Sequence, residues 1–123
     1  MSSELDQAIV FAKELLAGVE AKHGPITHKK MFGGAGLYAE GAIFAVIVDG
    51  EIMLKGDAAL GGEIEEAGGQ RWRYDGKAKP VMMPYWRLPP DAVDDPEVAV
   101  AWALKSIVAA TKSLQPTQKQ KTL

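Results

Sequence analysis

The sequence predicts an α+β domain in which helices pack on one face of an antiparallel sheet. An N-terminal segment has apolar residues at helical spacing, and a second such segment closes the folded part of the chain. Between them, apolar runs separated by Asp-Gly and Glu-Gly pairs indicate hairpins, because tight turns favour these residues. The predicted order is α-β(3)-α-β(2)-α.

The first helix is predicted to begin at Ser2 or Ser3, whose hydroxyl groups can cap it. Gly24 and Pro25 end the pattern, since glycine adopts the left-handed cap and proline cannot continue a helix. One stripe of apolar residues at steps of three and four is expected to be buried: Leu5, Ala8, Ile9, Ala12, Leu15, Leu16 and Val19.

Three strands are predicted to follow between Thr27 and Lys55 as an antiparallel meander. Asp49-Gly50 separates AIFAVIV from EIMLK, and Glu40-Gly41 separates AIFAVIV from the run before it. We therefore expect HKKMFGGAGLY to form the first strand of the meander.

Three glycines, Gly33, Gly34 and Gly36, lie inside that first strand. They are predicted to mark a bend or the close approach of another backbone. The alternative is a loop whose exposed backbone contacts a partner or a ligand. A dinucleotide or phosphate loop is disfavoured, because strand residues follow where a helix should begin and the P-loop Lys and Ser/Thr are missing.

A short or broken helix is expected in the segment DAALGGEIEEAG. Asp57 can cap it, whereas Gly61 and Gly62 each disfavour a helix interior by about 1 kcal/mol. The glutamates at 63, 65 and 66 are interpreted as a solvated helix face and not as a metal site, because no histidine or further acid at ligand spacing accompanies them.

A second hairpin is predicted in QRWRYDGKAKPVMMPYW, at an edge or a bulge, since Pro80 and Pro84 cannot donate ladder hydrogen bonds. This hairpin interleaves aromatic and basic residues, as do surfaces that stack bases over a charged groove. The candidate partner or nucleic-acid surface comprises Arg71, Arg73, Lys77, Lys79 and Arg87.

The register of this hairpin decides what its aromatic residues do. A two-residue turn at Asp75-Gly76 places Trp72 and Tyr74 opposite lysines, on a basic face. A three-residue loop aligns them with Ala78 and Pro80 and lets them point into the core. The core reading is favoured, because large rings dominate the burial of small domains.

The last helix is predicted to begin at Asp94 or Asp95, with Pro96 in its first turn. Trp102 is expected to pack against the sheet or the first helix. Residues 1–114 are expected to form a single domain and residues 115–123 a disordered tail, because the tail has too few apolar residues to offset its ordering entropy.

Composition narrows the classes of function. The 123 residues suit one domain, and the absence of cysteine excludes disulfides, thiolate zinc sites and a cysteine nucleophile. A net charge of -2 gives no field that attracts nucleic acid to the isolated chain. The N-terminus lacks the basic start of a secretory signal, and no apolar run approaches the roughly 20 residues of a membrane span, so a cytoplasmic location is expected.

No catalytic, cofactor or metal site is predicted. His23 lies at a helix end, where a cation suits the helix dipole, and His28 lies in a predicted strand with no nucleophile motif near it. We therefore expect a protein that is not an enzyme.

One set of motifs resembles the N-terminal domain of the TfoX/Sxy competence-regulator family: MFGG, the GLY that follows, LKGD, MPYWRLP and the helix around Trp102. The likeness covers nearly all of the folded chain. It implies the same α-β(3)-α-β(2)-α arrangement, described as secretion-chaperone-like, in a bacterial regulatory protein with no known catalytic residues. Full-length members that regulate natural competence carry a second, C-terminal helical domain, and this chain is expected to be a stand-alone first domain.

These features predict a noncatalytic regulatory or adaptor domain that acts through a protein partner. The alternative is a nucleic-acid-binding module that uses the hairpin 71–87. A sheet of this size has exposed edge strands, which pair with other chains unless they are blocked, so a homodimer is also expected.

Overall fold

The computed structural model describes residues 4–31, 33–75 and 80–121. Its helical segments are α1 (Glu4–Leu15), the 3-10 turn η1 (Ala17–Val19), α2 (Glu20–His23), α3 (Ala58–Glu66), the 3-10 turn η2 (Pro90–Ala92) and α4 (Pro96–Lys121). Its strands are β1 (Thr27–Met31), β2 (Gly34–Ala39), β3 (Ala42–Val48), β4 (Glu51–Lys55), β5 (Arg71–Asp75) and β6 (Pro80–Arg87). The predicted α+β class is confirmed.

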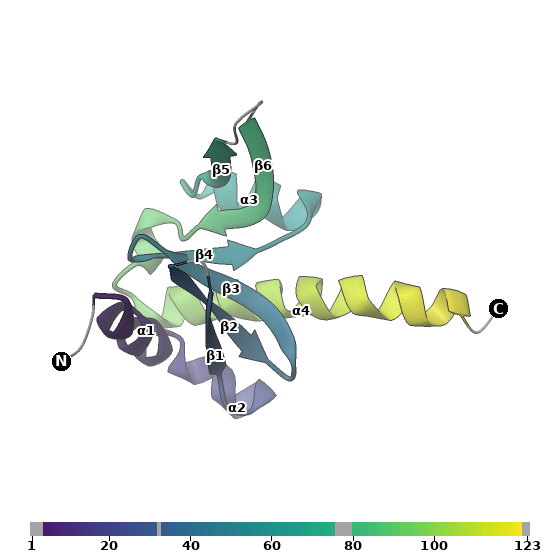
Figure 1. Ribbon diagram of the computed structural model, residues 1–123, viewed down its shortest axis with the longest axis horizontal. Coiled ribbons are helices and arrows are strands. Elements are labelled where there is room, and N and C mark those ends of the chain that lie inside the picture. Colours follow the sequence, from purple (N-terminus) through teal and green to yellow (C-terminus); the bar gives the residue numbers. More distant parts are fainter. Residues whose placement is uncertain (1–3, 32, 76–79, 122–123) are drawn as a thin grey trace.

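The strands form a six-stranded sheet in the order β1-β2-β3-β4-β6-β5, in which neighbouring strands are antiparallel. Figure 1 shows α4 running along the sheet, and β5 and β6 as an arm that rises from the rest of the domain. Helix α1 packs on β2, and α3 packs on β6. Helix α4 packs on β3 and β4. Their contacts bury one face of the sheet, as the sequence predicts.

The structure has four strands before α3, whereas the sequence predicts three. The segment expected as one strand folds back on itself as the β1–β2 hairpin, in which Met31 pairs with Gly34. Gly33 has a φ of 78°, which glycine adopts without steric penalty. A side chain on Gly34 would collide with the carbonyl oxygen of Ile47 on β3. The glycines therefore permit a turn and a close backbone approach, and not a bend within one strand.

Both predicted two-residue turns of the meander are confirmed. Glu40 and Gly41 have φ values of 53° and 81°, and Asp49 and Gly50 have φ values of 52° and 79°. Positive φ at both central positions is the type I′ geometry, whose twist matches that of the flanking strands. These turns set the register of β2 with β3 and of β3 with β4.

Two predicted helix caps are also confirmed. Asp57 Oδ1 accepts a hydrogen bond of 2.8 Å from the N–H of Leu60 at the start of α3. Asp95 Oδ1 accepts one of 3.1 Å from the N–H of Glu97, and Pro96 occupies the first position of α4.

The first helix differs from its prediction, which was one continuous helix up to Gly24. The first helix is interrupted after Leu15 by η1, where a Cβ on Gly18 would lie 3.1 Å from Val100 of α4. The predicted caps Ser2 and Ser3 lie outside the described residues. At the other end, α4 extends to Lys121, into the segment 115–123, and its last turns project beyond the body of the domain in Figure 1. Disorder of that segment in solution stays a prediction.

The helix α3 is short, as predicted, but its two glycines do not break it. Gly61 is buried under the indole of Trp86, and a Cβ at this position would lie only 2.5 Å from Trp86 Cε2. Trp86 Nε1 donates a 2.7 Å hydrogen bond to Glu65 in the next turn of α3. Glycine at position 61 therefore lets α3 approach β6, which outweighs its poor helix propensity.

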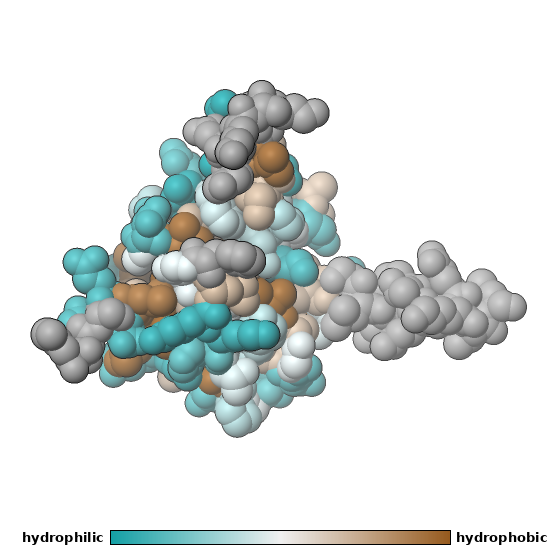
Figure 2. Space-filling model, in the orientation of Figure 1, coloured by the Kyte–Doolittle hydropathy of each residue, from teal (hydrophilic) through white to brown (hydrophobic). Residues whose placement is uncertain are grey.

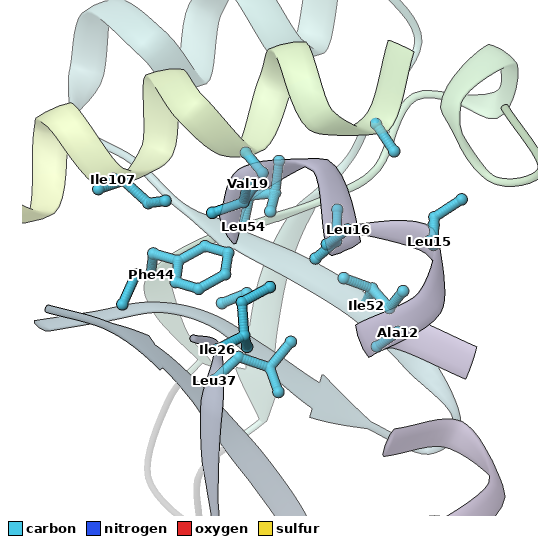
Figure 3. Packing of buried hydrophobic residues seen from close by; sticks show 14 of the residues in the cluster. Ala12, Leu15, Leu16, Val19, Ile26, Leu37, Phe44, Ile52, Leu54 and Ile107 are labelled. Carbon is cyan, nitrogen blue, oxygen red and sulfur yellow. The ribbon is translucent and has the colours of Figure 1, made fainter. Parts of the chain in front are cut away.

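Figure 3 shows the main core, which lies between the helices and the covered face of the sheet. Its fully buried side chains include Leu16, Leu37, Phe44, Leu54 and Ile107. A smaller cluster of Leu60, Ile64 and Trp86 joins α3 to β6, and Trp102 of α4 packs against both clusters.

A buried serine attaches α4 to the sheet. Ser106 Oγ lies 2.7 Å from the carbonyl oxygen of Phe44 and 2.5 Å from that of Lys55. Phe44 lies at a register shift between β2 and β3, where the ladder of backbone hydrogen bonds is interrupted. The Ser106 hydroxyl supplies a donor at this irregularity.

Candidate binding face of the sheet

Successive residues of a strand point to opposite faces, so the strands that bury Leu37, Phe44 and Leu54 present other side chains on the far side. Within the part of the chain that the structure describes, no helix packs on this far side. We call it the open face and define it by Lys29, Met31, Gly36, Tyr38, Ile43, Val46, Val48, Met53, Lys55, Trp72, Met83, Tyr85 and Arg87.

The open face contains a hollow of about 600 Å³. Met31 of β1 and Trp72 of β5 both line it although these are the two edge strands, so the sheet curls around it. Figure 2 shows apolar surface, in brown, between the β5–β6 arm and the rest of the domain. The lining is mostly apolar and comprises Met31, Gly34, Ala35, Ile43, Val46, Ile47, Val48, Asp49, Trp72, Met83 and Tyr85.

Two aromatic side chains form the wall on the β5–β6 arm. The rings of Trp72 and Tyr85 meet edge to face, with centroids 6.3 Å apart and an interplanar angle of 60°. Burial raises the pKa of Tyr85 above its ordinary value, and an electrostatic interaction with Tyr38 raises it further. The Tyr85 hydroxyl therefore stays protonated at neutral pH and can donate a hydrogen bond.

Both registers expected for the second hairpin are wrong. Asp75 pairs with Pro80 and Tyr74 with Val81, so residues 76–79, which lie outside the described residues, connect the strands. The register also shifts between Arg71 and Arg73, which is the bulge that the prolines predict. The half-buried Trp72 consequently lies on the open face beside Tyr85, and not in the core under the helices.

The glycines of β2 shape the floor of the hollow. A Cβ on Gly36 would lie 2.8 Å from Ile43 Cδ1 and 3.1 Å from Met31 Cε, so its absence lets these two side chains lie over the strand. Gly34 and Gly36 are buried and paired with neighbouring strands, whereas Gly33 is exposed in the turn. Of the predicted contact loop, only Gly33 presents an exposed backbone.

The basic residues predicted as a binding surface are dispersed. Arg71 Nε donates a 2.8 Å hydrogen bond to the carbonyl of Met83, and its guanidinium lies 4.8 Å from the ring centre of Trp86. Arg87 forms a 2.9 Å ion pair with Glu51. Arg73 is exposed on the edge strand β5 and has an interaction partner, while the lysines at 77 and 79 lie outside the described residues.

The histidines and glutamates that the sequence analysis weighed as catalytic or metal-binding groups mostly form contacts with other side chains of the domain. His23 Nδ1 lies 2.5 Å from Glu40 Oε2, and His28 is exposed on β1. Glu63 pairs with Lys105 at 2.8 Å, and Glu65 accepts the bond from Trp86 described above. Across the described segments, no three His, Cys, Asp or Glu residues form a group that could hold a metal ion.

The open face was not predicted from the sequence, although the apolar pattern of β3 indicates it. The segment AIFAVIV, which forms β3, is apolar at every position, so both faces of this strand are apolar. A strand that is apolar on both faces is expected to be covered on both.

We also find no helix among the described residues that is long and apolar enough to span a membrane.

Comparison with known proteins finds related sequences. The family model of the TfoX N-terminal domain matches residues 14–110. The DNA transformation protein TfoX1 of Aliivibrio fischeri (strain ATCC 700601 / ES114) is 34% identical over 53 residues, which are 43% of this chain and 25% of that protein. The matched part thus spans about a quarter of this relative's length. Because the family model covers well over half of the sequence, the chain belongs to the TfoX N-terminal domain family.

Proposed function

We propose that this chain is a noncatalytic regulatory or adaptor domain that binds a protein partner on its open face. The family supports a competence-regulator-like role, since one relative is named a DNA transformation protein. The observation that carries the proposal is the apolar hollow, which helices leave uncovered in the described part of the chain.

The residues of the hollow are of the types that dominate protein interfaces. Trp, Tyr and Met are enriched at the centres of such interfaces, where an apolar core is surrounded by a polar rim. Here Trp72, Met83 and Tyr85 line the hollow, and Arg87 with Glu51 forms a polar pair beside Met53 on the same face. A partner that inserts apolar side chains would bury this surface from water.

The nucleic-acid alternative has less support. Arg71 packs on Trp86 and Arg87 pairs with Glu51, so two of the five predicted basic residues are held by contacts within the chain. The net charge of -2 adds no general attraction for phosphates.

A complementation experiment tests the proposal. The host strain without this gene would be complemented with the natural chain, with Val48→Glu plus Met83→Glu on the open face, or with Val10→Glu plus Phe11→Glu. The last pair is a matched control on the outer side of α1, where Val10 and Phe11 are 56% and 47% exposed. We expect the natural chain and the α1 control to restore the transcriptional response of the host, and the open-face variant to fail. The circular dichroism spectrum of the open-face variant should match that of the natural chain. Full complementation by that variant would refute binding through the open face.

A further inference from the structure

A row of polar side chains crosses the open face at one end of the hollow. In the sheet register, Tyr38 pairs with Ile43, and Lys55 pairs with Tyr85. Directly paired residues of antiparallel strands point to the same side and have Cβ atoms about 5 Å apart. Because Ile43 and Tyr85 line the hollow, Tyr38 and Lys55 lie beside its lining.

Lys55 is a half-buried cation with an unusual environment. Leu54, its neighbour in the strand, is fully buried under the helices, so the Lys55 side chain points to the open face. No carboxylate among the described residues forms an ion pair with Lys55. The paired Tyr85 has a raised pKa, caused first by burial and then by Tyr38, so its neutral hydroxyl is available as a donor beside the lysine.

The acidic side chain of the hollow lies far from this row. Asp49 also lines the hollow, but it follows Ile43 by six positions on the chain, which is about 20 Å along an extended strand. The ion pair of Glu51 with Arg87 neutralises another acid of that end. The hollow therefore has an apolar middle and a cationic, hydrogen-bond-donating end.

We propose that the hollow is a binding site for a small amphipathic anion, that is, an apolar molecule with one carboxylate or sulfonate group. The apolar body lies against Trp72, Ile43 and Met83, and the anionic group accepts hydrogen bonds from Lys55 Nζ and the Tyr85 hydroxyl. The volume of about 600 Å³ falls within the range of roughly 300–1,000 Å³ that is usual for small-molecule sites.

This site goes beyond the proposed partner binding and does not depend on it. Where both occur, the anion and the protein partner compete for the same apolar surface, which would make the anion a regulator of the adaptor. The two proposals can be refuted independently. The experiment below uses purified protein without a partner, so its result bears on the anion site alone.

The test uses two fluorescent probes with the same type of ring system. Anilinonaphthalene sulfonate carries the anionic group, and phenylnaphthylamine lacks it. Both should bind the native protein saturably. Lys55→Glu should weaken binding of the sulfonate probe at least about tenfold, as expected for a charge-assisted hydrogen bond, and change binding of the neutral probe less than about twofold.

Three further variants keep the test decisive. Lys55→Met retains the aliphatic stem and should weaken only the sulfonate probe; Trp72→Ala should weaken both probes. Lys22→Glu on α2 makes the same charge change at an exposed site and should affect neither. The proposal is overturned if the native protein binds neither probe, or if Lys55→Glu and Lys22→Glu weaken the sulfonate probe equally. It is also overturned if Val10→Glu plus Phe11→Glu, on α1, abolishes binding.

Discussion

Two adjacent glycines of α3 offer a direct test of how this helix packs on the sheet. Replacing either by alanine should gain about 1 kcal/mol of helix propensity, because glycine is the poorer helix former. At Gly62, no atom lies within 4 Å of the new Cβ. At Gly61, the new Cβ would lie 2.5 Å from Cε2 and 2.7 Å from Cη2 of Trp86, closer than real contacts allow.

The magnitudes follow from these distances. Gly62→Ala should stabilise the domain by about 1 kcal/mol. Gly61→Ala adds an overpacking penalty of about 1–3 kcal/mol, since the indole is held by Glu65 and covered by Arg71. The propensity gain is common to both variants, so the difference between them should equal that penalty.

Equilibrium urea unfolding, followed by circular dichroism and tryptophan fluorescence, measures both free energies of unfolding. Gly61→Ala should also shift the emission of the native state, because the new methyl group displaces Trp86. Equal free energies of unfolding for Gly61→Ala and Gly62→Ala would refute the packing described here.

Three other predictions concern single groups. Ser106→Ala should lower the free energy of unfolding by about 1–3 kcal/mol, measured in urea, because it removes the one hydroxyl proton that the carbonyls of Phe44 and Lys55 share. Burial favours the neutral form of Tyr85, so the pKa of Tyr85 is higher in the folded than in the unfolded state. The stability that this difference contributes is fully present below about pH 10 and is lost as pH rises through the folded-state pKa. Tyr85→Phe should therefore flatten the fall in the free energy of unfolding that urea titrations measure above about pH 10. No specific, salt-sensitive DNA binding is expected in a fluorescence-anisotropy titration at physiological salt; tight binding that Arg71→Ala plus Arg73→Ala abolishes would contradict this.

Local chemistry made much of the fold predictable. The turns at Glu40-Gly41 and Asp49-Gly50 and the caps at Asp57 and Asp95 each depend on the residue that carries them, so a single sequence reveals them. The β1–β2 hairpin was not predicted because only Gly33 of the glycine cluster forms its turn. Gly34 and Gly36 are required instead by close packing against neighbouring strands, and the sequence does not distinguish these two roles.

The open face was less predictable, because it depends on long-range geometry. Trp72 lies beside Tyr85 only through the register shift in the β5–β6 hairpin, and no local pattern fixes that shift. Likewise, Met31 and Trp72 line one hollow only because the sheet curls. The predicted set of basic residues relied on closeness in sequence, whereas alternation along the strands places Arg71 and Trp72 on opposite faces.

This alternation connects the two faces and leads to a last prediction. Trp86 packs against α3 on the covered face, while its neighbour Tyr85 lines the hollow on the open face. Displacing Trp86 by Gly61→Ala should therefore move Tyr85 and weaken binding of phenylnaphthylamine several-fold, whereas Gly62→Ala should leave it unchanged. A Gly61→Ala protein that is destabilised in urea yet binds the neutral probe as the natural chain does would show that the hollow is independent of α3. The wall of the hollow would then be held by the contacts of β6 with β4 and β5 alone.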